Sequence, residues 1–70
     1  MKDFQLLDVV ALVGDRHDDG LVSGQVGVIV EVLDDGVFEV EFCDNEGRPY
    51  ALLPVCAERL MVLRYSPVAA

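Results

Sequence analysis

The densest group of side chains that could do chemistry lies between two glycines, in residues 14–20. Oxygen-rich loops of this kind can bind divalent cations. The spacing differs from that of a calcium loop, because the segment has no Asp-x-Asp-x-Asp-Gly run and no bidentate glutamate downstream. We therefore expect a solvated loop, and no metal site, at Asp15, His17, Asp18 and Asp19.

The other candidates for catalysis do not form a recognisable set. A nucleophilic site needs a nucleophile, a base and an orienting group in contact, and His17 is the only histidine. Cys43 follows a glutamate-bearing segment, whose negative charge disfavours a reactive thiolate. Cys56 lies between apolar residues and is expected to contribute to packing. Asp34 and Asp35 fall in a tight surface turn and not in a cleft. We expect a protein that is not an enzyme and needs no cofactor.

Acidic side chains around the middle of the chain are better suited to binding a partner. Glu39 and Glu41 alternate with apolar residues, so both project from the same outward face of a strand. Aspartates of the flanking turns extend this acidic surface, and a tyrosine beyond them is suited to anchor an interface. The candidate partner-binding residues are Asp34, Asp35, Glu39, Glu41, Asp44 and Tyr50. The alternative is a solvated face without a partner.

The net charge restricts the class of partner. Thirteen acidic residues and five basic ones give a formal net charge of −8. The basic residues are scattered, so no basic stripe exists for a phosphate backbone, and we expect neither nucleic acid nor an anionic membrane as a partner. A basic protein is the natural complement. The alternative is that the charge only keeps an apolar protein soluble.

Length and composition predict one soluble domain over residues 1–70. Hydrophobic residues make up 53% of the chain, enough for a dense core without staples. The two cysteines lack the spacing of a metal site or a disulfide framework and are expected to be reduced, as in a cytoplasmic protein. No signal peptide and no stretch of roughly 20 apolar residues is apparent. Residues 66–70 are expected to form a loose tail.

The clearest structural unit is a hairpin over residues 26–42. Residues 26–33 are rich in β-branched side chains, which favour a strand, and the Asp-Gly pair that follows is a strong hairpin signal. The next segment alternates with a period of two. Phe38, Val40 and Phe42 are therefore predicted to face the core, while the glutamates between them face water.

The first strand of this hairpin is apolar on both faces, with four valines on one face and Ile29 and Leu33 on the other. A strand buried on both sides is typical of a tightly curled barrel, in which one long strand bends and serves two sheets. Gly27 is placed where such a bend is useful. The alternative is that one face is exposed as an oligomer interface.

The remaining segments complete the pattern of a small, all-β, SH3-like five-stranded barrel. Pro54 is expected to end the fourth strand because it has no amide donor. A hairpin turn is predicted at residues 43–48, and one helical turn at 55–59 precedes the last strand. The three further strands are predicted at residues 7–13, 50–53 and 60–65.

Two resemblances add to this interpretation. Residues 24–30 resemble the glycine-punctuated segment that begins the KOW motif of SH3-like ribosomal and transcription-factor domains. Those relatives carry basic residues for RNA, which this chain lacks. The whole chain resembles a family of small bacterial proteins classed as domain of unknown function 4926. The matching segments are residues 6–12, 24–27, 29–33, 36–42 and 50–53.

The second resemblance implies an SH3-like barrel but transfers no activity and no functional residues. Its members look like one half of two-gene units, which implies an antitoxin or immunity-type partner of a neighbouring gene product. Together with the charge, this favours a non-enzymatic protein-binding module. The alternatives are an accessory subunit or small homo-oligomeric structural protein and, ranked below these, an RNA-binding KOW-like domain.

Overall fold

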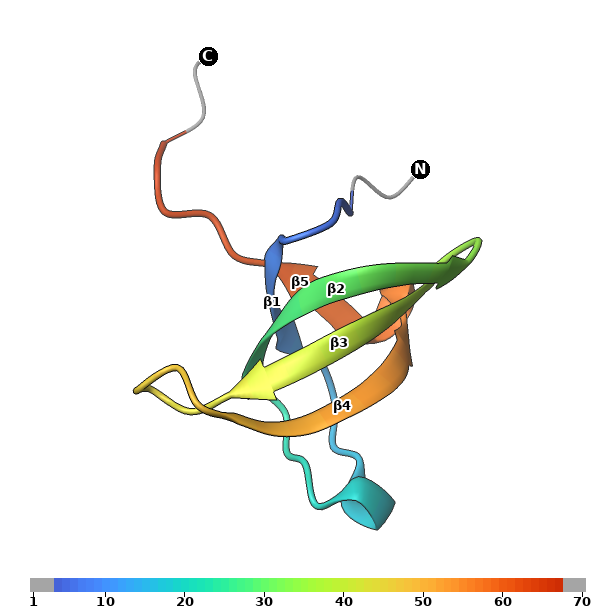
Figure 1. Ribbon diagram of the computed structural model, residues 1–70, viewed down its shortest axis with the longest axis vertical. Helices are drawn as coiled ribbons and strands as arrows, with labels where there is room; N and C mark the ends of the chain where they lie inside the picture. Colours follow the sequence, from blue (N-terminus) through green and yellow to red (C-terminus); the bar gives the residue numbers. More distant parts are fainter. Residues whose placement is uncertain (1–3, 68–70) are drawn as a thin grey trace.

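The computed structural model describes residues 4–67. These residues form one five-stranded antiparallel sheet with the strand order β4-β3-β2-β1-β5, curled on itself (Figure 1). The all-β class, the five strands and the helical turn before the last strand are thus confirmed. The strands are β1 (Val9–Leu12), β2 (Val26–Asp34), β3 (Val37–Cys43), β4 (Pro49–Cys56) and β5 (Leu60–Val62), and the two 3-10 turns are η1 (His17–Asp19) and η2 (Ala57–Arg59).

The core lies inside the curl of the sheet. Phe38, Val40 and Phe42 of β3 are buried, as their alternation predicts, and the residues between them lie on the outer face. They pack with apolar side chains from the other four strands and from the loop after β1. Burying an aliphatic or aromatic side chain stabilises the fold by about 1.5–3 kcal/mol, so this cluster is the main source of stability. The other fully buried side chains are Val10, Leu12, Leu21, Ile29 and Val55.

Strand β2 bends and joins the two halves of the sheet. Its first residues pair with β1, and from Gly27 onward it also pairs with β3. A Cβ atom on Gly27 would lie 2.7 Å from Val40 Cγ1 and 2.8 Å from the backbone oxygen of Glu41, so only glycine allows this close approach. Strand β2 is thus long, as expected, but it joins β1 and β3 within one continuous sheet and does not serve two sheets.

The prediction that β2 is buried on both faces is wrong. Val26, Val30, Val32 and Leu33 are exposed, and only Gly27 and Ile29 reach the core. The pairing of β2 with β3 shifts after Ile29 and again after Val32, which is typical of β-bulges. Within the described residues β1 pairs with β2 only as far as Val28, so the second half of β2 pairs with β3 alone, and its side chains from Val30 to Leu33 are exposed (Figure 1).

Strand β4 also differs from the prediction, because it continues through Pro54 to Cys56. Within residues 4–67 it is an edge strand that pairs only with β3. The carbonyl oxygen of Pro54 accepts a hydrogen bond from Arg16 Nη1 (2.9 Å), which places the polar side of this residue away from β3. The missing amide hydrogen of Pro54 therefore costs no hydrogen bond of the ladder.

The terminal strands are shorter than predicted, β1 beginning at Val9 and β5 ending at Val62. Leu7 is exposed and has a φ of 71°, which is incompatible with an extended strand. The tail prediction falls partly on residues 68–70, outside the described residues, while Ser66 and Pro67 lie in neither strand nor helix. Among residues 4–67, no helix is long and apolar enough to cross a membrane.

Candidate functional site

Three glutamates lie together on the outer face of the sheet. Glu39 and Glu41 project from β3 on the side opposite the core, as predicted. Glu31 of β2 is paired directly with Glu39 in the strand register. We call Glu31, Glu39 and Glu41 the glutamate row.

The sequence did not indicate that Glu31 belongs to this row. Uninterrupted alternation along β2 places Glu31 on the same face as Ile29, which is the core face. The bulge at Val30 shifts the register by one residue, so Glu31 lies opposite Glu39 while Val32 lies opposite Phe38. No residue type in β2 signals this bulge, because bulges depend on how the paired strand fits against its neighbour.

The glutamate row has no counter-charge within residues 4–67. The ion pairs there involve the 15–19 loop and the β3–β4 turn, and none reaches the three glutamates. Like charges directly opposite each other in a sheet are destabilising, by about 0.2–1 kcal/mol. Glu31 and Glu39 therefore form an arrangement that costs stability in the isolated protein.

Apolar side chains border the row on both sides. Val28 of β2 and Leu52 of β4 are the strand partners of Glu41, and Pro54 is the strand partner of Glu39. Leu52 is 56% exposed. This outer surface thus presents carboxylates between exposed hydrophobic groups, a combination that a basic and partly apolar surface would complement.

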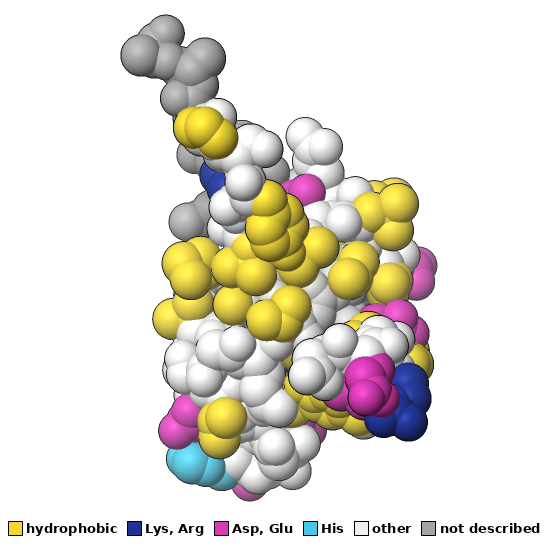
Figure 2. Space-filling view, turned by 90° about the vertical axis from the view of Figure 1, so that its left-hand side faces the viewer, with side chains coloured by type: hydrophobic (Ala, Val, Ile, Leu, Met, Phe, Trp, Pro, Cys, Tyr) yellow, Lys and Arg dark blue, Asp and Glu magenta, His cyan; other side chains and the backbone are white. Residues whose placement is uncertain are grey.

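A groove with a volume of about 400 Å³ lies at one end of this outer face, between the start of β2 and the β3–β4 turn. We call this groove the Tyr50 groove, and its lining includes Gln25, Val26, Val28, Cys43, Asp44 and Tyr50. Figure 2 shows one face of the molecule, on which hydrophobic side chains gather while acidic side chains lie mostly toward the edges of the view.

Tyr50 is held in place at its hydroxyl group. Gln25 Nε2 donates a hydrogen bond to the Tyr50 hydroxyl (2.9 Å), and Gln25 Oε1 accepts one from the Val22 amide (2.6 Å). Tyr50 as a whole is 47% exposed. A fixed, partly exposed aromatic ring loses little conformational entropy when a partner covers it, which makes Tyr50 a suitable anchor.

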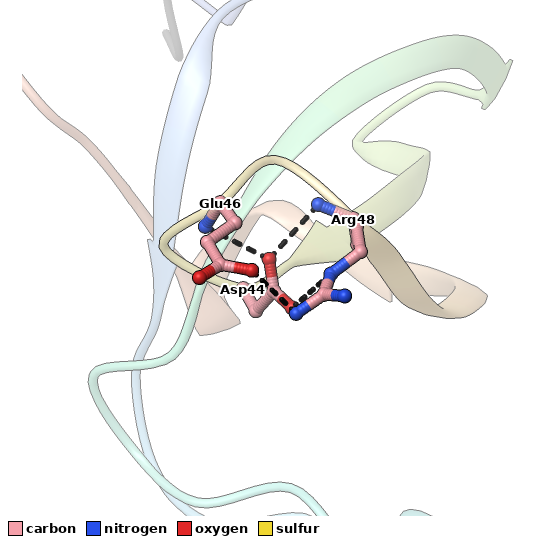
Figure 3. Close-up of polar contacts among 3 residues, drawn as sticks. All are labelled: Asp44, Glu46 and Arg48. Atoms are coloured by element: carbon pink, nitrogen blue, oxygen red, sulfur yellow. Dashed lines mark hydrogen bonds and ion pairs between the residues drawn. The ribbon is translucent and has the colours of Figure 1, made fainter.

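Asp44 organises the β3–β4 turn. Its Oδ1 accepts hydrogen bonds from the amides of Glu46 and Arg48, both at 2.9 Å, and its Oδ2 accepts one from Arg48 Nε at 3.2 Å (Figure 3). Arg48 Nη2 also donates to the Glu46 carboxylate. The hydrogen bonds from the Arg48 and Glu46 amides lower the pKa of Asp44 below its ordinary value. The carboxylate of Asp44 is therefore largely occupied by its own turn.

Asp34 and Asp35 lie at the far end of the β2–β3 hairpin. Asp34 Oδ1 accepts a hydrogen bond from the Asp35 amide (2.7 Å), and Gly36 completes the turn with a φ of 74°. The structure thus distributes the predicted residues over three places: Asp44 and Tyr50 at the groove, Glu39 and Glu41 in the glutamate row, and the two aspartates at the hairpin tip.

The acidic loop after β1 is held by two arginines. Arg59 donates hydrogen bonds to the carbonyl oxygens of Val13 and Asp15, both at 2.9 Å. Arg16 forms an ion pair with Asp19 at 2.9 Å, and its backbone pairs with Leu21 to close the loop around η1. Among the described residues, no three His, Cys, Asp or Glu side chains are grouped as metal ligands.

The two cysteines are free and lie at opposite ends of the β3–β4 ladder, Cys43 opposite Pro49 and Cys56 opposite Val37. Cys43 is half-buried at the Tyr50 groove. Cys56 is exposed, so the expectation that it contributes to packing is wrong; the alternation of β4 turns its neighbour Val55 toward the core instead.

Comparison with known families gives a match over most of the chain. The model of the family described as Domain of unknown function (DUF4926) matches residues 6–62. The chain belongs to this family. The matched DUF4926 segment contains all five strands, the glutamate row and the residues named for the Tyr50 groove. Comparison with curated proteins and with solved structures gives no match.

Proposed function

We propose that this DUF4926 protein is a non-enzymatic binding module whose acidic outer face docks a basic protein. The glutamate row carries the proposal. Three carboxylates lie on neighbouring strands without an ion pair to any residue in 4–67, and two of them oppose each other directly. Lysine or arginine side chains of a partner would relieve this repulsion. Binding then removes an unfavourable interaction of the free protein, and this relief adds to the affinity of the complex.

The net charge of −8 acts in the same direction at longer range. It attracts a basic protein before contact and raises the association rate, an effect that decreases with ionic strength. The partner that fits the resemblance noted above is the product of a neighbouring gene, a basic toxin or enzyme that this protein neutralises. The free thiols are consistent with a cytoplasmic encounter, because cysteines there are normally reduced.

Self-association through the exposed strand faces is the second candidate. Val26 and Met61 flank Ala11 across three strands and are both exposed. An apolar row of this kind suits a homo-oligomer, but each copy would bring the same negative charge to the interface. We therefore rank it below a basic partner.

The test compares two variants with the same change in net charge. Glu39→Lys with Glu41→Lys reverses the glutamate row, whereas Asp18→Lys with Glu58→Lys reverses two exposed acids away from it. Tagged wild type and both variants are used to capture proteins from the native host at about 150 mM salt. The captured protein is then purified, and its affinity for wild type and for each variant is measured by titration.

We expect wild type and the Asp18/Glu58 control to retain one basic protein in stoichiometric amount. The Glu39/Glu41 variant should bind it at least about thirtyfold more weakly, because charge pairs desolvated in an interface are worth about 2–5 kcal/mol. Equal affinity of the two double variants, or recovery of wild type without a basic protein, contradicts the proposal.

A further inference from the structure

The outer face of β3 orders its side chains as a linear site. Because alternate residues of a strand share a face, Cys43, Glu41 and Glu39 follow one another on this side of β3. Cys43 lies at the Tyr50 groove, and the two glutamates continue from it along the strand. Neighbours in this series are two residues apart, which corresponds to about 6.6–6.8 Å along a strand.

The Tyr50 groove presents an apolar surface. Val26 and Tyr50 are 39% and 47% exposed, and Val28 and Cys43 are half-buried beside them. Of the polar side chains that line it, the Gln25 amide is bonded at both ends and Asp44 accepts three hydrogen bonds from its own turn, which leaves the neutral amide of Asn45. An apolar group loses little by entering such a site, whereas a charged group would leave its water without gaining a partner of opposite charge.

The size of the groove limits what can enter it. A volume of about 400 Å³ is near the lower end of the range of ligand pockets, and here the space is open to solvent. One large aromatic or aliphatic side chain fits such a space. The rigid Tyr50 ring, tied through Gln25, gives that side chain a preformed wall to pack against.

We propose that the Tyr50 groove and the glutamate row together bind an extended segment of a basic protein with the pattern apolar–x–basic–x–basic. The apolar side chain enters the groove beside Cys43 and Tyr50, and the two basic side chains pair with Glu41 and Glu39. This inference rests on the proposed function and specifies which part of the basic partner is recognised.

Charge complementarity selects this occupant over a second copy of the chain. A copy would bring a net charge of −8 to the glutamate row. Of its four arginines within residues 4–67, Arg16, Arg48 and Arg59 are bonded to their own carboxylates or carbonyl groups. The exposed Arg64 alone cannot supply the two basic side chains that the glutamate row would pair with.

The test uses blocked five-residue peptides and amide chemical shifts of the ¹⁵N-labelled full-length protein. The probe is Trp-Ser-Arg-Ser-Arg. One control replaces the tryptophan with serine, and a second replaces both arginines with glutamine. We expect the probe to shift the amides of Val28, Cys43 and Tyr50, and each control peptide to bind at least about tenfold more weakly.

Protein variants locate the binding site. Tyr50→Ala should weaken binding of the probe about tenfold and Tyr50→Phe much less, because phenylalanine retains the ring and loses only the hydroxyl bond to Gln25. Val26→Ala provides a second test on another wall of the groove, with a smaller loss. The spectrum of each free variant shows whether the variant is folded.

The outcomes separate the two proposals. If Tyr50→Ala and Val26→Ala bind both the probe and the captured basic protein as wild type does, while the Glu39/Glu41 variant binds neither, the groove is not part of the site and the proposed function stands. If the probe at millimolar concentration leaves the amides near the groove unshifted, the inference is overturned. If the captured protein also binds the Glu39/Glu41 variant with the affinity of wild type, the proposed function is contradicted as well.

Discussion

Gly27 lies at a close approach between β2 and the strand that carries Glu39 and Glu41. Because the atoms facing it are a buried valine methyl group and a backbone oxygen, neither can move far to admit a side chain. We expect Gly27→Ala to lower the free energy of unfolding by about 1–3 kcal/mol, the usual cost of overpacking. Urea denaturation measures this change. Val22→Ala, at an exposed position, should change stability by less than about 0.5 kcal/mol, and an equal effect of the two would contradict the packing argument.

Asp44 should make the β3–β4 turn sensitive to acid. Its pKa is lowered in the folded protein by hydrogen bonds from the Arg48 and Glu46 amides, so the ionised form stabilises the fold above the ordinary pKa of an aspartate. This contribution is lost as the pH falls from about 5 through the lowered pKa. Asp44→Asn keeps an oxygen acceptor for both amides but cannot titrate.

We therefore expect the stability of wild type to fall more steeply with acid than that of Asp44→Asn, with most of the difference arising below about pH 5. Thermal unfolding at several pH values measures it. Asp18→Asn serves as the control, because Asp18 lies exposed in the 15–19 loop. Parallel pH profiles for wild type and Asp44→Asn would show that the turn does not depend on the charge of Asp44.

Among the elements, the β2–β3 hairpin joins the fold to the proposed site. Glu31 and Glu39 face each other across it. Glu31→Lys replaces a like-charge pair with an opposite-charge pair, and we expect the free energy of unfolding to rise by about 0.2–1 kcal/mol. The gain should disappear in Glu31→Lys with Glu39→Gln, and high salt should reduce it. No gain in the single variant at low salt would mean that the two side chains avoid each other. Positions in a binding site are often suboptimal for stability, so the same substitution should weaken binding of the basic partner.

The same hairpin shows how far the sequence alone predicts the structure. The alternation of β3 and the Asp-Gly turn are local signals, and both the buried face and the outward glutamates follow from them. The bulge at Val30 is not local, since it depends on how β2 fits against β3, and it places Glu31 in the site. The Tyr50 groove is also beyond sequence reasoning, because it forms only when Gln25 and Val26 meet a turn more than fifteen residues further along the chain.

The whole molecule combines a strong negative charge with exposed hydrophobic side chains on most of its strands. At neutral pH the charge opposes contact between copies, although apolar surface is available on the outer face. Repulsion vanishes near the sequence isoelectric point of about 4.2, where the hydrophobic contacts are unopposed.

We accordingly expect a monomer at pH 7 and reversible association near pH 4.2, measured by light scattering over a range of protein concentrations. Added salt at pH 7 should favour association weakly, since it screens the repulsion between copies. Met61→Ser, on the exposed face of β5, should reduce association at the lower pH without affecting the monomer at pH 7. A stable dimer at pH 7 that persists at low protein concentration would reverse the order of the two proposals. It would mean that the apolar strand faces are an interface between copies, and the glutamate row would then serve only to keep that dimer soluble.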